Sequence, residues 1–233
     1  GFFQAGVAEL TMACCCIGMA LHGGVIAACG TFFVFSDYMK PAVRMAALME
    51  LPVKFIWTHD AFRVGEDGPT HEPVEQEAQI RLMEKLRNHS GRNSMLVLRP
   101  EDSKATTTCW QLAMENTKTP TALIFSRQNI EDLPEGNNYD SIKNGAYITA
   151  GSDDAFDVIL VGNGSEVSTL VAGARLLQQE GNKARIVSVP SEGLFREQPK
   201  DYQNEVLPAG IKRFGMTAGL PCTLESLVGE NGA

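Results

Sequence analysis

A polar segment between residues 58 and 75 holds several side chains that could act on a ligand. It contains two of the chain's four histidines, His59 and His71, and the carboxylate of Asp67. Imidazoles donate hydrogen bonds to oxyanions and hydroxyls and carry protons, so these residues indicate a polar substrate pocket. A turn followed by a helix capped by Thr70 is the structural alternative. A metal site ranks last, because the spacing of the two histidines matches no helical ligand pair.

Glu9 is an acidic residue within an otherwise apolar stretch over residues 5–21. A carboxylate on such a face usually reaches solvent or caps a neighbouring group, which is the structural interpretation. If it is buried instead, the loss of hydration raises its pKa and suits it to share a proton with a ligand nitrogen.

Aromatic residues gather between positions 31 and 38, among them Phe32, Phe35 and Tyr38. Most such clusters belong to the core, but a flat heteroaromatic ligand could also stack on these rings. Arg127 follows a later apolar run and could bind a phosphate through two hydrogen bonds. A lone arginine at such a place is more often part of a surface ion pair.

The turn at residues 162–164, Gly-Asn-Gly, is a further candidate, as an anion cradle before a helix. It lacks the third glycine of a dinucleotide-binding motif and the lysine of a P-loop. We therefore favour a tight turn into a helix that Ser165 caps.

The composition is that of an acidic globular protein. Of 233 residues 44% are apolar and 21% charged, and 28 acidic residues against 20 Lys and Arg give a net charge of −8. This balance allows a large core and argues against nucleic acid or an anionic membrane as a partner. The apolar run over residues 12–30 is broken by a His-Gly-Gly sequence and lacks a basic start, so it predicts neither a membrane span nor a signal peptide.

The six cysteines form no Cys-x-x-Cys pair, so neither a zinc knuckle nor a redox motif is indicated. Three are consecutive, at Cys14, Cys15 and Cys16, and adjacent side chains on a helix point to different sides. We expect buried free thiols in a reducing compartment, and hence a cytoplasmic protein.

Alternating elements must position these side chains. The patterning predicts strands over residues 25–31, 53–58, 95–98 and 121–125, separated by helices over 35–50, from 74 onwards and over 101–116, with a buried helix over 5–21 in front. Such alternation indicates an α/β fold with a mostly parallel sheet and helices on both faces. Ligands of such sheets lie beyond the carboxyl ends of the strands. We therefore expect the chemistry just after Thr31, Thr58, Arg99 and Phe125.

A polar, turn-rich stretch over residues 131–144 reads as a linker. Beyond it the pattern restarts, with strands predicted over residues 158–161 and 184–189 and a helix over 165–180. The sequence thus predicts a first domain over residues 1–130 and a second, smaller α/β domain over 145–233.

The chain resembles transketolases, which are thiamine-diphosphate enzymes, in seven segments: GVAE (6–9), LHGG (21–24), TFFVFSDY (31–38), VRMAAL (43–48), THD (58–60), GEDGPTHEPVEQ (65–76) and SRQN (126–129). The run from Gly65 to His71 is specific to this group. Deoxyxylulose-phosphate synthases share only its Asp-Gly-Pro-Thr-His core, and dehydrogenase E1 β-subunits share the architecture and the glutamate.

The resemblance implies a pyrimidine-binding domain over residues 1–130 and part of the family's C-terminal domain over 145–233. It implies that Glu9 holds the N1′ nitrogen of the cofactor's aminopyrimidine and, by exchanging a proton with it, promotes deprotonation of the thiazolium C2. The rings that would wall the pyrimidine are Phe32, Phe35 and Tyr38.

On the substrate side, the resemblance implies that His59 and Arg127 face the phosphate of a sugar, and that Asp67 and His71 bind its hydroxyls. His71 would also move protons. The implied reaction transfers a two-carbon ketol unit from a ketose phosphate to an aldose phosphate, as in the pentose phosphate pathway.

The family's diphosphate-binding domain, which holds Mg²⁺ or Ca²⁺, has no counterpart in the chain, and we expect no metal ligand here. We expect a fragment of a longer protein that forms a homodimer, or part of the second subunit of a split enzyme. The chain departs from the family at Ala8, where Arg is usual, and at residues 61–63, where Arg63 could alter the substrate channel.

Three alternatives stay open. The chain could be the corresponding part of a deoxyxylulose-phosphate synthase-like or E1 β-like enzyme. It could be a non-catalytic α/β module that serves docking or dimerisation. It could also be a nucleotide-binding module built on residues 162–164.

Overall fold

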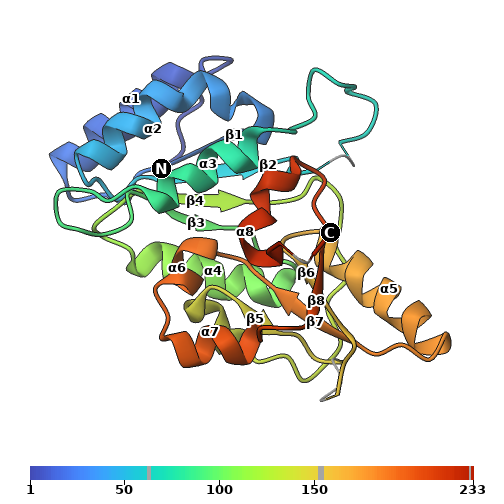
Figure 1. The fold of residues 1–233 in the computed structure, drawn as a ribbon. Coiled ribbons are helices and arrows are strands. Elements are labelled where there is room, and N and C mark those ends of the chain that lie inside the picture. The colour runs from blue at the N-terminus through green and yellow to red at the C-terminus, as the bar shows by residue number, and fades with distance from the viewer. Residues whose placement is uncertain (62–63, 152–154, 231) are drawn as a thin grey trace.

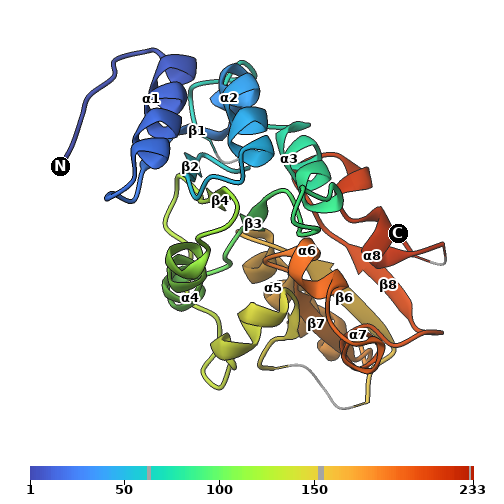
Figure 2. The ribbon, with the colours of Figure 1, turned by 90° about the vertical axis from the view of Figure 1, so that its left-hand side faces the viewer.

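Two four-stranded sheets organise the chain (Figures 1 and 2). The structure is a computed structural model that describes residues 1–61, 64–151, 155–230 and 232–233. The first sheet is entirely parallel. Its strands lie in the order β1 (Ala28–Phe32), β2 (Lys54–Thr58), β4 (Thr121–Ile124) and β3 (Leu96–Leu98).

Helices cover both faces of this sheet, as its apolar strands require. Figure 1 shows α1 (Glu9–His22) and α2 (Ser36–Leu48) above it and α4 (Ser103–Glu115) below it. Phe55 and Trp57 of β2 pack toward α1 and α2, whereas Leu123 of β4 packs toward α4. The short helix η1 (Phe33–Phe35) joins β1 to α2, and α3 (Gln76–Lys85) packs between the two halves of the chain.

The second sheet is mixed. Its order is β5 (Tyr147–Ile148), β7 (Ala184–Ser188), β6 (Val158–Gly162) and β8 (Lys212–Gly215), with β5 antiparallel and the rest parallel. One face packs on α5 (Glu166–Gln179). The other packs on α6 (Glu192–Arg196), α7 (Lys200–Val206) and α8 (Glu225–Val228).

These observations confirm the predicted fold class, a mostly parallel sheet with helices on both faces followed by a smaller α/β unit. In the part of the chain that the structure describes, eight α-helices and strands follow β4, and the sequence patterning did not predict five of them: β5, α6, α7, β8 and α8. All five are short, and β8 reads Lys-Arg-Phe-Gly, which gives no apolar alternation. The predicted linker carries η2 (Tyr139–Asn144), which packs on α4.

The prediction of a buried helix over residues 5–21 is wrong in two respects. The helix begins at Glu9, and within it only Ala13 and Cys16 are buried. It packs on α2 and β1 with one face, while Val7 just before it is 97% exposed. A helix that is apolar all round needs cover on more than one side. The described part of the chain supplies that cover on one side only.

The cysteine prediction is also partly wrong. All six thiols are free, but Cys14, Cys15 and Cys222 are exposed, and only the other three are buried. The first two follow from the one-sided packing of α1. Among the described residues, no helix is long and apolar enough to cross a membrane.

Candidate active site

The carboxyl ends of β1 and β2 bring two predicted site residues into contact. Phe32 is the last residue of β1 and pairs in register with Thr58, so His59 emerges directly beside it. The two rings stack with centroids 3.5 Å apart and planes 18° apart. His59 has a positive φ of 63°, which few residues other than glycine adopt. This unusual backbone conformation accompanies the turn of the imidazole onto Phe32.

Three further rings extend the stack. Phe35 lies 6.0 Å from both Phe32 and Tyr38, and the imidazole of His71 meets Phe35 edge-on at 5.2 Å. We call Phe32, Phe35, Tyr38 and His71, together with His59, the aromatic–histidine cluster. It is open to solvent, because Tyr38 is 64% exposed and Phe32 and Phe35 are partly exposed. The cluster is therefore a shelf of ring faces and not a closed core.

Charged residues surround the His59 imidazole. Its pKa is lowered, mainly by partial burial and next by the positive charge of Arg127, while the carboxylates of Asp67 and Asp60 oppose the shift. Arg127 is exposed and forms no ion pair with the described residues, so a surface ion pair does not explain it. Gly65 lies over this guanidinium, and a Cβ there would stand 3.4 Å from its Cζ. The loop and Arg127 thus lie close together.

Glu9 is the first residue of α1 and is partly exposed. Because only residues 23–27 separate α1 from β1, the helix runs back along the strand, and its first turn lies toward the end where β1 finishes. No described residue forms a hydrogen bond or an ion pair with its carboxylate.

The predicted cap at Thr70 is wrong. α3 begins at Gln76 without a side-chain cap, and the Thr70 hydroxyl instead shares a 2.8 Å hydrogen bond with Nδ1 of His71. Within the described ranges, no three His, Cys, Asp or Glu side chains are grouped closely enough to hold a metal ion. Arg63, where the chain departs from the family pattern, lies outside the described residues.

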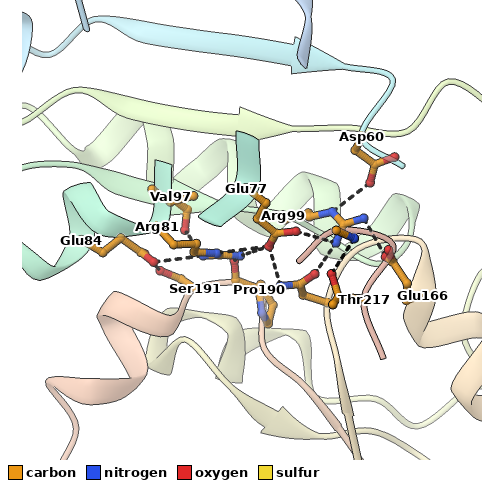
Figure 3. A network of polar contacts seen from close by, with 12 residues as sticks. Asp60, Glu77, Arg81, Glu84, Val97, Arg99, Glu166, Pro190, Ser191 and Thr217 are labelled. Atoms are coloured by element: carbon orange, nitrogen blue, oxygen red, sulfur yellow. Dashed lines mark hydrogen bonds and ion pairs between the residues drawn. The ribbon is translucent and has the colours of Figure 1, made fainter. Parts of the chain in front are cut away.

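The third predicted position, after β3, holds a buried charge network that the sequence analysis did not anticipate (Figure 3). Arg99 is 1% exposed and donates to Asp60 at 3.0 Å, to Glu77 at 3.0 Å and to Glu166 at 2.6 Å. Asn163 also accepts from it and donates to Glu77. The network joins the two halves, because Glu166 and Asn163 follow β6 while the other members belong to the first half.

A second guanidinium extends the network. Arg81 donates to Glu77 and Glu84 on its own helix and to the carbonyl oxygen of Pro190 in the second half. Ser191 donates to Glu84 at 2.9 Å. Three charged residues at positions 77, 81 and 84 share one helix face. That spacing is the sequence signal that could have revealed the network.

The network around Arg99 also decides between the two interpretations of the turn at residues 162–164, an anion cradle or a tight turn. Gly164 has a φ of 53°, and a Cβ there would lie 2.5 Å from Nε of Arg99. Its N–H donates to the carbonyl oxygen of Arg99. A guanidinium therefore fills the space that an anion cradle would need. The predicted cap is wrong as well, because the Ser165 hydroxyl makes no capping hydrogen bond to α5.

Two family models match the chain. The transketolase pyrimidine-binding domain matches residues 1–132, and the transketolase-like TK C-terminal domain matches residues 145–233. A probable transketolase of Streptococcus pneumoniae is 46% identical over 210 residues, which are 90% of this chain and 30% of that protein.

Solved structures agree with the sequence matches. A transketolase from Leishmania mexicana superimposes with a TM-score of 0.83 at 38% identity, over 92% of this chain and 30% of that one. A transketolase from Pichia stipitis in complex with sedoheptulose-7-phosphate gives 0.80 at 37% identity, over 90% and 30%. A split-gene transketolase, solved as an inactive beta4 tetramer, shares the fold with a TM-score of 0.71 at 22% identity, over 92% and 63%.

The chain spans 30% to 33% of the length of the curated relatives it matches. One family model covers more than half of the chain, and a second covers most of the rest. The fold, the ring shelf beyond β1 and these matches agree, and the chain belongs to the transketolase family.

Proposed function

We propose that this chain is the part of a transketolase that binds the pyrimidine half of thiamine diphosphate and one side of the sugar substrate. The whole protein would transfer a two-carbon ketol unit from a ketose phosphate to an aldose phosphate, a step of the pentose phosphate pathway. The observation that carries the proposal is the aromatic–histidine cluster beside Arg127 at the carboxyl end of the first sheet. The family membership and the relative solved with sedoheptulose-7-phosphate support it.

The residues of this chain suit an aminopyrimidine ring. Phe32, Phe35 and Tyr38 offer partly exposed ring faces that can stack on a flat heterocycle. Glu9 offers a carboxylate that no described residue engages. Its carboxyl oxygen would exchange a proton with the N1′ ring nitrogen. When bound, thiamine diphosphate supplies the nucleophilic carbon and the electron sink that ketol transfer requires.

The remaining site residues suit a phosphorylated sugar. His59 and Arg127 lie within electrostatic range of each other, and together they offer hydrogen-bond donors to a phosphate. Asp67 and His71 would bind the sugar hydroxyls. The edge-on contact between His71 and Phe35 keeps that imidazole at the border of the ring shelf, where it can pass a proton to a reacting oxygen.

The diphosphate and its Mg²⁺ or Ca²⁺ would be held by a diphosphate-binding domain from a second copy of the same protein or from a partner subunit. The present chain covers 63% of the split-gene relative's chain, and that relative supports the arrangement with a partner subunit. A cytoplasmic location completes the proposal, and six free thiols fit a reducing compartment.

The test supplies the intact protein with thiamine diphosphate, Mg²⁺, a ketose phosphate donor and an aldose phosphate acceptor, and measures the ketose formed. Formation of a ketose two carbons longer than the acceptor is the expected result. Turnover of a 2-oxo acid in place of the ketose phosphate would favour the synthase-like or E1 β-like alternative. Absence of turnover with every donor would favour the non-catalytic module.

A further inference from the structure

We propose that Asp60, held by Arg99, is a positioning residue that fixes His59 in the aromatic–histidine cluster. The buried charge network between the two halves of the chain would thereby set the geometry of the substrate site. The kinetic part of this inference rests on the proposed function, whereas the structural part does not.

The connection runs through adjacent residues. Asp60 follows His59 directly and is buried, and its Oδ2 accepts a 3.0 Å hydrogen bond from Nε of Arg99. Arg99 is itself held by the carboxylates of Glu77 and Glu166. Figure 3 shows Asp60 reaching the guanidinium from one side while Glu166 reaches it from the other. One end of the His59 peptide is therefore tied to a rigid, buried group.

The backbone of His59 makes such a tie necessary. Its φ of 63° lies in the left-handed region, which costs a residue other than glycine on the order of 1 kcal/mol or more. This conformation persists only where the surroundings impose it. On the other side of His59, Thr58 is the last residue of β2 and its hydroxyl lies 2.9 Å from Nδ1 of the imidazole. The strand β2 on one side and the Asp60–Arg99 ion pair on the other thus restrain the backbone of His59.

Asp60 can be removed without leaving a buried charge unpaired. The network sets two guanidiniums, on Arg81 and Arg99, against four carboxylates. Without Asp60, Arg99 keeps both Glu77 and Glu166. The penalty for breaking a buried ion pair comes mainly from the uncompensated partner. An Asp60 variant is therefore expected to fold.

The first experiment compares crystal structures of the intact protein with Asp60→Ala, Asp60→Asn and Glu166→Ala. Alanine removes the acceptor for Arg99, whereas asparagine keeps an oxygen that can accept from Nε. Glu166→Ala is the matched control, because it also removes a carboxylate from Arg99 but is remote from His59 in sequence. We expect the His59 ring to leave Phe32 in Asp60→Ala only. Asp60→Ser, also too short to reach Arg99, gives the same expectation if the alanine variant is unstable.

The second experiment measures KM and kcat of the same variants for a phosphorylated ketose. Displacement of a binding group is expected to raise KM about tenfold or more in Asp60→Ala, with near wild-type values in Asp60→Asn and Glu166→Ala. A ring that stays on Phe32 in Asp60→Ala, or that leaves it equally in Glu166→Ala, would overturn the inference. If the His59 ring is displaced in Asp60→Ala while KM stays unchanged, the result would support Asp60 as a positioning residue. It would contradict the substrate role of His59 in the proposed function.

Discussion

The imidazole of His59 lies flat on the ring of Phe32, with 3.5 Å between the ring centroids. Phe32 ends β1 and His59 directly follows the neighbouring strand β2; Phe32 also stacks with Phe35, and the positive charge of Arg127 acts on the imidazole. A ligand with a flat ring at one end and an anion at the other would meet matching groups in this order.

His59→Ala and Arg127→Ala are each expected to raise KM for phosphorylated sugars about 10- to 100-fold. A hydrogen bond to a charged group contributes about 1.5–3 kcal/mol, and the phosphate would lose one. Steady-state kinetics with phosphorylated and unphosphorylated donors provide the measurement. The unphosphorylated donor is its own control, and equal effects on both donors would show that neither residue touches phosphate.

Glu9→Gln is expected to abolish activation of the cofactor while leaving the fold intact. The amide keeps the volume of the side chain but cannot exchange a proton with a ring nitrogen. Exchange of the C2 proton of thiamine diphosphate, followed by NMR in the intact protein, is the measurement. Glu115→Gln, an exposed change on α4, serves as the control. Near-normal exchange in the Glu9 variant would refute the assignment.

Short-range sequence patterns predicted the elements of the first sheet, and they singled out the residues that the structure brings together in the aromatic–histidine cluster. Strand ends of a parallel sheet meet at one edge, so Phe32 and His59 could be expected together. Arg99 was expected at the same edge, but its side chain turns into the interface between the halves. Its partners Glu77 and Glu166 lie 22 and 67 residues away, and no local pattern encodes a pairing at such distances. The exposed face of α1 was missed for a related reason, because apolar composition does not say what covers a helix.

The stability of the protein is expected to fall with rising pH because of Glu101. This side chain is fully buried, and burial raises its pKa to about 7, although Tyr147 donates a hydrogen bond to it. Below about pH 4.5 both the folded and unfolded states bind the proton. Between about pH 4.5 and pH 7 the folded state binds more, so stability is lost over this range, by about 3 kcal/mol.

Glu101→Gln carries no charge and should remove this dependence. Urea denaturation at about pH 4.5 and pH 8 would show it, as a free energy of unfolding that shifts in favour of the variant at the higher pH. Glu115→Gln, on the exposed side of α4, should keep the pH dependence of the parent. A constant difference between Glu101→Gln and the parent at both pH values would contradict the prediction.

The 233-residue chain alone is expected to show no ketol transfer and no micromolar, Mg²⁺-dependent binding of thiamine diphosphate. Ring stacking and one carboxylate contact are too little to offset the loss of ligand freedom, and a net charge of −8 repels a diphosphate. Calorimetry with the cofactor and Mg²⁺ is the measurement. Activity restored by adding a separately produced diphosphate-binding domain would support the proposal, and micromolar binding to the chain alone would contradict it.

The network around Arg99 and Arg81 holds the two halves of the chain in association. Each half buries charges whose partners lie in the other, and Arg99 also fills the space beside Gly164. Separating the two halves would leave a guanidinium or a carboxylate without its counterion. The loss of a counterion by a buried charged group is strongly destabilising. The covalent connection through residues 131–144 is therefore not what keeps them associated. A chain nicked there would behave as a tight complex of two peptides, and either peptide alone would be an incomplete folding unit.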